Sequence, residues 1–236
     1  MIFPRNADVS YLELILGPMY SGKTSQIINL YEYCLEHKIS VCVINHALDK
    51  RYSDNMLSTH DGKMIPCLNL HNLNDIYDNP INARLIKYSK IVLINEGQFF
   101  KDLLEFTNNL LDTTIPNQYK QVYICGLDGD FKRNKFGQLL DLIPYCDGIT
   151  KLKSICKQCL NNDRQNNQGQ NNQCQNNQGQ NNQGQEKNAI FSHRITGEKD
   201  QTLIGSSAYI PLCRSCFLQE NKMDFQTLSH TIALPY

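Results

Sequence analysis

The segment GPMYSGKT, Gly17 to Thr24, has the clearest chemical signature in the sequence, because it fits the pattern G-x-x-x-x-G-K-[ST]. Glycines let the backbone curl until successive N–H groups point inward, and Lys23 adds a cation for the β- and γ-phosphates. Thr24 offers a hydroxyl to magnesium, and a helix after the loop would present its positive end. The loop predicts a nucleoside triphosphate site, which switches, motors, transporters and kinases all share.

Two cysteine pairs form a second constellation, Cys156-x-x-Cys159 and Cys213-x-x-Cys216. Each pair can place two thiolates on one metal ion, and two pairs complete a tetrahedron. Four thiolates fill such a site, so we expect a structural zinc ion without an open catalytic position. A redox pair is the alternative. The remaining cysteines outside the repeat described below are interpreted as small buried hydrophobes, namely Cys34, Cys42, Cys67, Cys125 and Cys146.

Glu96 is the third candidate, because it follows the apolar run from Ile91 to Ile94. A carboxylate at the end of a buried strand can accept the hydroxyl proton in a phosphoryl transfer. A glutamate that caps a helix or forms a salt bridge is the alternative interpretation.

Alternating strands and helices must position these residues. Apolar, β-rich runs predict strands over 11–17, 40–45, 90–95 and 121–129, with helices over 25–37 and 102–111 between them. In the first helix, the spacing places Ile27, Ile28, Tyr31, Cys34 and Leu35 on one side. This order predicts an α/β fold: a P-loop, RecA-like parallel sheet with flanking helices and its site at the carboxyl ends of the strands.

Composition divides the chain at about residue 150. We expect a P-loop ATP-binding α/β domain over 1–150, a small zinc-clipped domain over 151–217 and an unassigned tail over 218–236. Residues 165–185 repeat QNNQG, once as QNNQC, and Cys174 is their one apolar residue. Such a tract cannot bury enough surface to offset its ordering entropy, so we expect disorder. A prion-like or binding tract is the alternative.

Charge and hydropathy exclude several partners. Lysine plus arginine and aspartate plus glutamate both total 23, which favours neither nucleic acid nor a membrane surface as a general partner. No apolar run approaches the roughly 20 residues that span a bilayer. The first residues do not read as a secretion signal, so we expect a cytoplasmic protein.

The ordered segments GPMYSGKT, LDKRYSDNMLSTHDG, NEGQFF, LDGDFKRNKFG, FSHR and CRSC resemble the type II thymidine kinases, the cellular and poxviral family with a zinc-bearing lasso. The resemblance covers roughly residues 11–217, interrupted by the repeat. It implies ATP-dependent phosphorylation of the thymidine 5′-hydroxyl to dTMP, for DNA synthesis, with Mg²⁺ and a structural Zn²⁺. It also implies a homo-oligomer, a dimer or tetramer, with dTTP as feedback inhibitor. A kinase for another deoxynucleoside such as deoxyuridine, or a zinc-clipped pseudo-enzyme that binds nucleotide without transfer, are the alternatives.

The resemblance assigns roles residue by residue, with Glu96 as the catalytic base. The expected ATP and magnesium residues are Gly17, Pro18, Met19, Tyr20, Ser21, Gly22, Lys23, Thr24, Asp49, Lys50, Arg51, Asn95, Glu96, Gly97 and Gln98. The expected nucleoside residues are Met19, Phe99, Leu127, Phe131, Phe136, Ser192, Gln201, Thr202, Leu203, Ile204, Gly205 and Tyr209. In isolation, core packing is the better interpretation for each of Met19, Phe99, Leu127, Phe131 and Phe136. Between Ile204 and Tyr209 the chain is one residue shorter than many relatives.

Asn95 departs from the family pattern, in which an aspartate usually precedes the glutamate of EGQFF. Asparagine keeps the shape of aspartate, and its carbonyl can accept a hydrogen bond from a magnesium-bound water, but it carries no charge. Asp49, Thr24 and the ATP phosphates would then hold the ion. We therefore expect an active enzyme with weakened magnesium affinity.

The composition of the repeat generates the first prediction. Deleting residues 165–185 leaves thymidine affinity and turnover within a few-fold of the unmodified protein, because the tract cannot contribute to a packed core. Steady-state kinetics and zinc content measured on the same preparation check this. A large loss of activity at normal zinc content would show that the repeat is functional.

Overall fold

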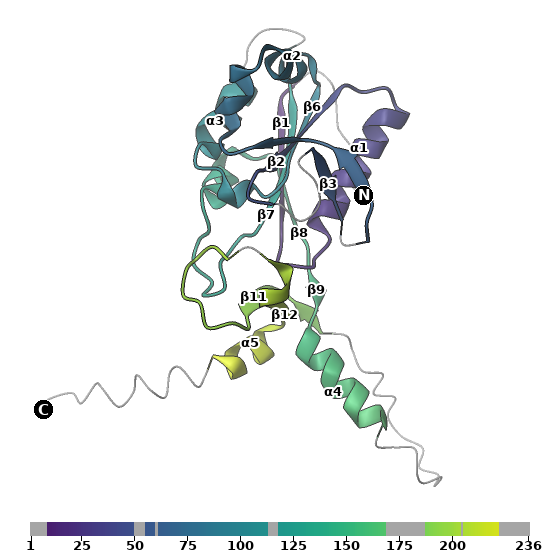
Figure 1. Cartoon of the computed structure of the whole chain (residues 1–236), viewed down its shortest axis with the longest axis vertical. Helices are drawn as coiled ribbons and strands as arrows, with labels where there is room; N and C mark the ends of the chain where they lie inside the picture. The colour runs from purple at the N-terminus through teal and green to yellow at the C-terminus, as the bar shows by residue number, and fades with distance from the viewer. Residues whose placement is uncertain are drawn as a thin grey trace, which may run out of the picture.

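A computed structural model describes residues 9–49, 55–59, 61–112, 118–168, 187–203 and 205–221 of the chain (Figure 1). Three expected site residues, Lys50, Arg51 and Ile204, lie outside the described residues, as do most of the repeat and the tail from 222. None of the helices described in these ranges combines the length and apolar character needed to cross a membrane.

A six-stranded sheet forms the centre of the fold, with strand order β5-β2-β6-β7-β1-β8. Every neighbouring pair is parallel, which confirms the predicted sheet. The strands are β1 (Tyr11–Leu16), β2 (Val41–His46), β5 (Leu68–Leu70), β6 (Ile91–Ile94), β7 (Gln121–Gly126) and β8 (Gly148–Lys151). Because β8 ends at Lys151, the sheet passes the expected domain boundary at 150 by one residue.

Side-chain alternation along the strands builds a core on each face of the sheet. In β1, Leu12, Leu14 and Leu16 belong to one cluster and Ile15 belongs to the other. The first cluster lies under η1 (Leu73–Asp78), α2 (Pro80–Tyr88), α3 (Leu103–Leu111) and η3 (Leu139–Tyr145). The second lies under α1 (Lys23–Glu36) and the hairpin of β3 (Met56–Ser58) and β4 (Met64–Pro66). Burial on both faces explains the near-continuous apolar runs of the sequence.

Helix α1 differs from its predicted face at one position. Ile27, Ile28 and Cys34 are buried as expected, but Leu35 is 57% exposed and Leu30 is buried instead. The buried stripe of the helix is therefore shifted toward Leu30 and does not include Leu35, which lies in the last turn next to the helix end at Glu36.

Most of the remaining elements lie below the sheet (Figure 1). Two short hairpin-like pairings form there: β9 (Ser154–Ile155) with β10 (Asn188–Ala189), and β11 (Phe191–Arg194) with β12 (Tyr209–Leu212). The other elements are η2 (Gly97–Phe99) at the sheet edge, and α4 (Lys157–Gln168), η4 (Ser206–Ala208) and α5 (Arg214–Glu220) around the cysteines.

Helix α4 corrects the expected start of disorder. It continues through residues 165–168, the first four positions of the repeat, and projects away from the sheet (Figure 1). A helix already nucleated at Lys157 adds one backbone hydrogen bond for each residue it fixes, so it extends into a polar sequence more easily than it starts there. Residues 169–185 lie outside the described residues.

Candidate active site

The phosphate loop connects β1 to α1 at the carboxyl edge of the sheet. Gly22 has φ 83° at the first position before α1, a backbone region that glycine adopts without strain. A Cβ at Gly17 would lie 2.8 Å from the carbonyl oxygen of Leu152, so the close approach of these two backbones requires glycine there. Lys23 is buried and donates from Nζ to the carbonyl of Pro18 at 2.8 Å, which places its ammonium within the loop.

The loop opens onto a cavity of about 320 Å³ that fits the phosphates of a nucleotide. Ser21 lines it, and Ser21 Oγ is a buried polar atom without a hydrogen-bond partner in the described part of the chain. The loop and its helix contribute Met19, Tyr20, Ser21, Gly22, Lys23, Thr24 and Ser25 to the lining. Asp49 lies on the same wall, together with Leu48, Thr59 and Asp61, which the residue-by-residue assignment did not include.

Glu96 lies at the cavity at the end of β6, one strand from β7 and two from β1. Its backbone is left-handed, with φ 56° and ψ 41°. Such a conformation is uncommon for a residue with a side chain and is often found at functional sites. Its carboxylate Oε2 accepts a hydrogen bond from Gln98 Nε2 at 2.6 Å. A carboxylate is thus held beside the phosphate loop, as the sequence predicts for a general base.

Aromatic side chains form a slot next to Glu96. Phe99 and Phe136 meet edge to face, with centroids 5.5 Å apart and ring planes at 88°, and Leu127 lines the same wall. Phe131 is not among the residues that line the cavity; its ring lies 3.9 Å from the guanidinium carbon of Arg194. The structure therefore brings Phe99, Leu127 and Phe136 to the cavity and places Phe131 behind it.

The lasso, residues 187–203 and 205–212, completes the cavity with Gln201, Thr202, Leu203, Gly205 and Tyr209. Arg194 holds this segment and was not among the sequence-based candidates. Its guanidinium is buried and donates to the carbonyls of Glu198, Asp200 and Gln201 and to the hydroxyl of Tyr209. A buried cation surrounded by backbone acceptors fixes the loop around it. In the sequence, Arg194 is marked only as the last residue of the segment FSHR, and that segment does not reveal which groups the arginine contacts.

Two side chains fasten the lasso to the phosphate-loop domain. Ser192 Oγ accepts a hydrogen bond from the backbone N–H of Met19 at 2.9 Å, so this expected nucleoside residue contacts the phosphate loop directly. Gln201 Nε2 donates to the Asp130 carboxylate at 3.0 Å. Asp130 in turn accepts hydrogen bonds from the N–H groups of Lys132 and Asn134 and thereby shapes the loop after β7.

Asn95 belongs to a buried row of amides. Its Nδ2 donates to Asn45 Oδ1 at 2.7 Å, and Asn45 Nδ2 donates to Asn69 Oδ1 at 3.0 Å. The thiol of Cys125 donates to Asn95 Oδ1 at 2.9 Å. Asn95 is 1% exposed and is not among the residues that line the cavity. Its side chain therefore links β7, β6, β2 and β5 across the sheet.

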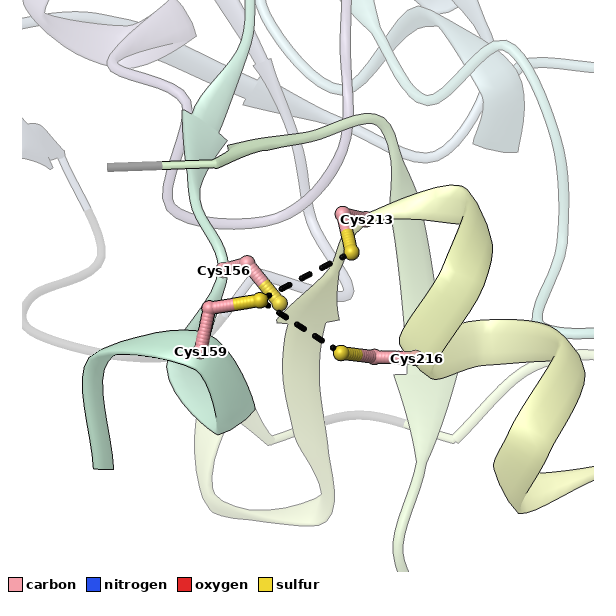
Figure 2. Close-up of side chains that lie close together, drawn as sticks. All are labelled: Cys156, Cys159, Cys213 and Cys216. Atoms are coloured by element: carbon pink, nitrogen blue, oxygen red, sulfur yellow. Dashed lines mark hydrogen bonds between the residues drawn. The ribbon is translucent and has the colours of Figure 1, made fainter. Parts of the chain in front are cut away.

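The four cysteine thiols converge below the lasso (Figure 2). Their sulfur atoms all lie within 4.8 Å of one another, and Cys159 Sγ lies 3.9 Å from Cys213 Sγ and 3.5 Å from Cys216 Sγ. Zinc–sulfur bonds of about 2.3 Å give tetrahedral sulfur–sulfur distances of about 3.8 Å, so the residues fit a Cys₄ zinc site.

The electrostatic surroundings of Cys156 favour a thiolate. Burial opposes its ionisation, but hydrogen bonds from the backbone and thiols of Cys159 and Cys213 outweigh burial and lower the pKa of Cys156 to about 7. Burial raises the pKa of Cys216. Binding of a divalent cation, which requires thiolates, would thus release protons.

The parallel sheet carries a phosphate loop after its first strand and a carboxylate after β6, and a lasso with four cysteines covers the cavity. Together these features define a P-loop phosphotransferase. A family model described as "Thymidine kinase" matches residues 10–185. The chain belongs to the thymidine kinase family, and its activity is that of a thymidine kinase. The family, the activity and the fold class predicted from the sequence are thereby confirmed.

Full-length relatives agree with this assignment. The thymidine kinase of sheeppox virus is 32% identical over 214 residues, 90% of this chain and 99% of the viral protein. The cytosolic thymidine kinase of Bos taurus is 29% identical over 210 residues, 89% of this chain and 72% of the bovine protein. Among solved structures, Pif1 helicases on forked DNA match with a TM-score of 0.31 at 14% identity, over 62% of this chain and 40% of theirs.

The convergence of the thiols generates a prediction about stability. Cys213→Ser lowers zinc stoichiometry and thermal stability together, because structural zinc contributes directly to the free energy of folding. A loss of about 2 kcal/mol corresponds to roughly 4–8 °C in Tm for a chain of this size. Metal analysis and thermal unfolding check this, with Cys146→Ser, outside the cluster, as matched control. Stoichiometric zinc in a stable Cys213→Ser variant would remove Cys213 from the ligand set.

Proposed function

We propose that Glu96 is the general base in transfer of the ATP γ-phosphoryl group to the 5′-hydroxyl of thymidine. The 5′-oxygen forms a bond to the γ-phosphorus while the bond from that phosphorus to the β–γ bridging oxygen breaks, and ADP leaves with the electron pair. The hydroxyl proton passes to the Glu96 carboxylate. The position of this carboxylate on the cavity wall, opposite the lasso and beside the phosphate loop, is the observation that carries the proposal.

The proposed binding roles follow the two walls of the cavity. The phosphate-loop backbone and Lys23 hold the ATP phosphates, and Lys23 neutralises negative charge as it develops. Phe99 and Phe136 form an apolar wall against the thymine ring, and backbone groups of 201–205 read its polar edge. Tyr209, fixed by Arg194, closes the slot.

Magnesium, when bound with ATP, neutralises phosphate charge and keeps the reacting groups in line. Thr24 and Asp49, which both lie at the cavity, are the residues that would hold it. The amide of Asn95 is buried and engaged with Asn45 and Cys125, so position 95 would act on the ion from a distance, through its charge or lack of charge.

Regulation and assembly are part of the same proposal. We infer dTTP as feedback inhibitor, because it combines the nucleoside and the triphosphate for which the two walls are suited. We further infer a homo-oligomer, a dimer or tetramer, and a cytoplasmic location; two relatives of this chain, from Gallus gallus and Bos taurus, carry the name "Thymidine kinase, cytosolic".

The amide row generates a prediction for Asn95→Asp. The new carboxylate would face Asn45 Oδ1 in the interior, so unfolding free energy at pH 7.5 falls by roughly 1–3 kcal/mol. Burial raises the pKa of such a carboxyl above its unfolded value, so the loss is full above the folded pKa and recovers as pH falls through it. Urea unfolding at pH 5 and 7.5 measures this, with the exposed Asn161→Asp as control.

The same variant tests the proposed magnesium role. The added negative charge lowers the magnesium concentration that gives half-maximal activity. An unchanged magnesium titration removes position 95 from the surroundings of the metal, and unchanged stability at pH 7.5 contradicts the buried amide row.

The role of Glu96 is tested by Glu96→Gln. Loss of the proton acceptor lowers kcat by roughly 10²–10⁴-fold while the Kd for ATP stays within about three-fold, because the phosphate loop is unchanged. Turnover of radiolabelled ATP with thymidine, deoxyuridine and other deoxynucleosides, alongside ATP binding, checks both. Glu105→Gln, an exposed carboxylate on α3, is the matched control.

Each other outcome of this experiment has a definite meaning. Full turnover by Glu96→Gln overturns the base assignment. ATP binding without transfer by the unmodified protein, at every magnesium concentration, supports the pseudo-enzyme, and a preference for deoxyuridine supports the other kinase.

A further inference from the structure

Gln98 is the side chain that connects Glu96 to the nucleoside slot. It is 3% exposed, and both ends of its amide are engaged. Nε2 donates to Glu96 Oε2 at 2.6 Å, and Oε1 accepts the backbone N–H of Leu127 at 3.0 Å. The amide thus bridges the carboxylate after β6 and the first residue after β7. The family resemblance assigns Gln98 to the ATP and magnesium residues. Its hydrogen bonds here are to Glu96 and Leu127 instead.

The two partners fix which end of the amide faces Glu96. A backbone N–H can only donate and an ionised carboxylate can only accept, so each partner suits one end of the amide. A turned amide would place NH₂ against the N–H of Leu127 and a carbonyl oxygen against the carboxylate. Gln98 therefore always presents a donor to Glu96.

Close packing around Gln98 leaves its amide one position. A Cβ at Gly126 would lie 2.4 Å from Gln98 Oε1, and a Cβ at Gly137 would lie 2.1 Å from the Gln98 carbonyl oxygen. Gly137 also has φ 59°, so the chain after the slot approaches Gln98 in a conformation that glycine adopts without strain. Two glycines from different segments thus make room for this one residue.

We propose that Gln98 is a positioning residue that holds the carboxylate of Glu96 for proton abstraction and sets its distance from the slot wall through Leu127. The inference rests on the proposed function of Glu96 as base. Gln98 itself exchanges no proton and touches no substrate. Without this hydrogen bond the carboxylate of Glu96 loses a contact that orients it toward the slot, although its backbone remains left-handed. Fixed geometry of this kind is what accelerates a proton transfer between bound groups.

The experiment compares Gln98→Glu with Gln98→Leu in the full chain. A protonated carboxyl at position 98 has the shape and hydrogen bonds of the amide: its carbonyl accepts from Leu127 and its hydroxyl donates to Glu96. The shared proton resides at position 98, because that site is the more deeply buried of the two. Once the pair loses this proton at higher pH, two carboxylates face each other and repel.

The expected results separate positioning from folding. At the acid end of the pH profile, Gln98→Glu keeps kcat within about three-fold of the unmodified enzyme. It then gains an alkaline limb on which kcat falls by more than about ten-fold. Gln98→Leu loses about 10–100-fold in kcat at every pH and gains no such limb. In both variants the KM for thymidine and the Kd for ATP stay within about three-fold.

Gln121→Glu is the matched control, because this half-buried glutamine at the other end of β7 bonds to the Tyr123 hydroxyl and not to Glu96. It gains no alkaline limb.

Two results would overturn the proposal while leaving Glu96 as base: a Gln98→Glu pH profile that matches the unmodified enzyme, or changes in KM without changes in kcat. Full turnover by Glu96→Gln, or none by the unmodified enzyme, overturns the base assignment and the positioning role with it. If Gln98→Leu fails to fold, the pH profile of Gln98→Glu alone decides.

Discussion

Parallel pairing in one register is the constraint on which the site depends. β7 pairs with both β1 and β6: Leu16 lies opposite Gly126, and Ile94 lies opposite Ile124, two residues before the end of β7. The chain segments that leave these strands carry the phosphate loop, Leu127 and Glu96. Because parallel strands deliver all their carboxyl ends to the same edge, backbone pairing brings residues from three distant segments together. Side-chain bonds such as that from Leu127 N–H to Gln98 then fix their positions.

The lasso differs from the sheet, because few backbone hydrogen bonds between strands hold it in place. Its loop between β11 and β12 depends on one buried cation, Arg194, whose donors take up carbonyl oxygens of Glu198, Asp200 and Gln201. The thiol cluster holds the base of the lasso, and the bond from Met19 N–H to Ser192 holds its side. Polar contacts thus hold the loop between β11 and β12, whereas the strands of the lasso pack into a small apolar cluster with Phe217. A loop with few apolar contacts opens at a lower free-energy cost than a packed core.

The sequence predicted the elements that hydrophobic periodicity defines and missed the contacts that tertiary packing defines. Continuous apolar runs identified β1, β2, β6 and β7 and missed β5 and β8, which are short and contain no fully buried residue. The phosphate loop, Glu96 and the cysteine pairs have spacings that require no knowledge of the fold. Arg194 and Asp130 lack such a signal, because their partners are backbone groups brought close only after folding. Leu35 was wrongly predicted to be buried, because periodicity shows which side of a helix is apolar but not how much of that side the sheet covers.

Asn95 shows how the fold accommodates a neutral asparagine where the family usually has a charged aspartate. An isolated carboxylate at a site that is 1% exposed would need a cation or several donors nearby. The neighbours here are the Cys125 thiol and the amides of Asn45 and Asn69, which are neutral donors and acceptors in alternation. A neutral side chain at position 95 matches such a row, since each amide both gives and receives. The departure at 95 is therefore best understood together with Asn45, to which its amide is bonded.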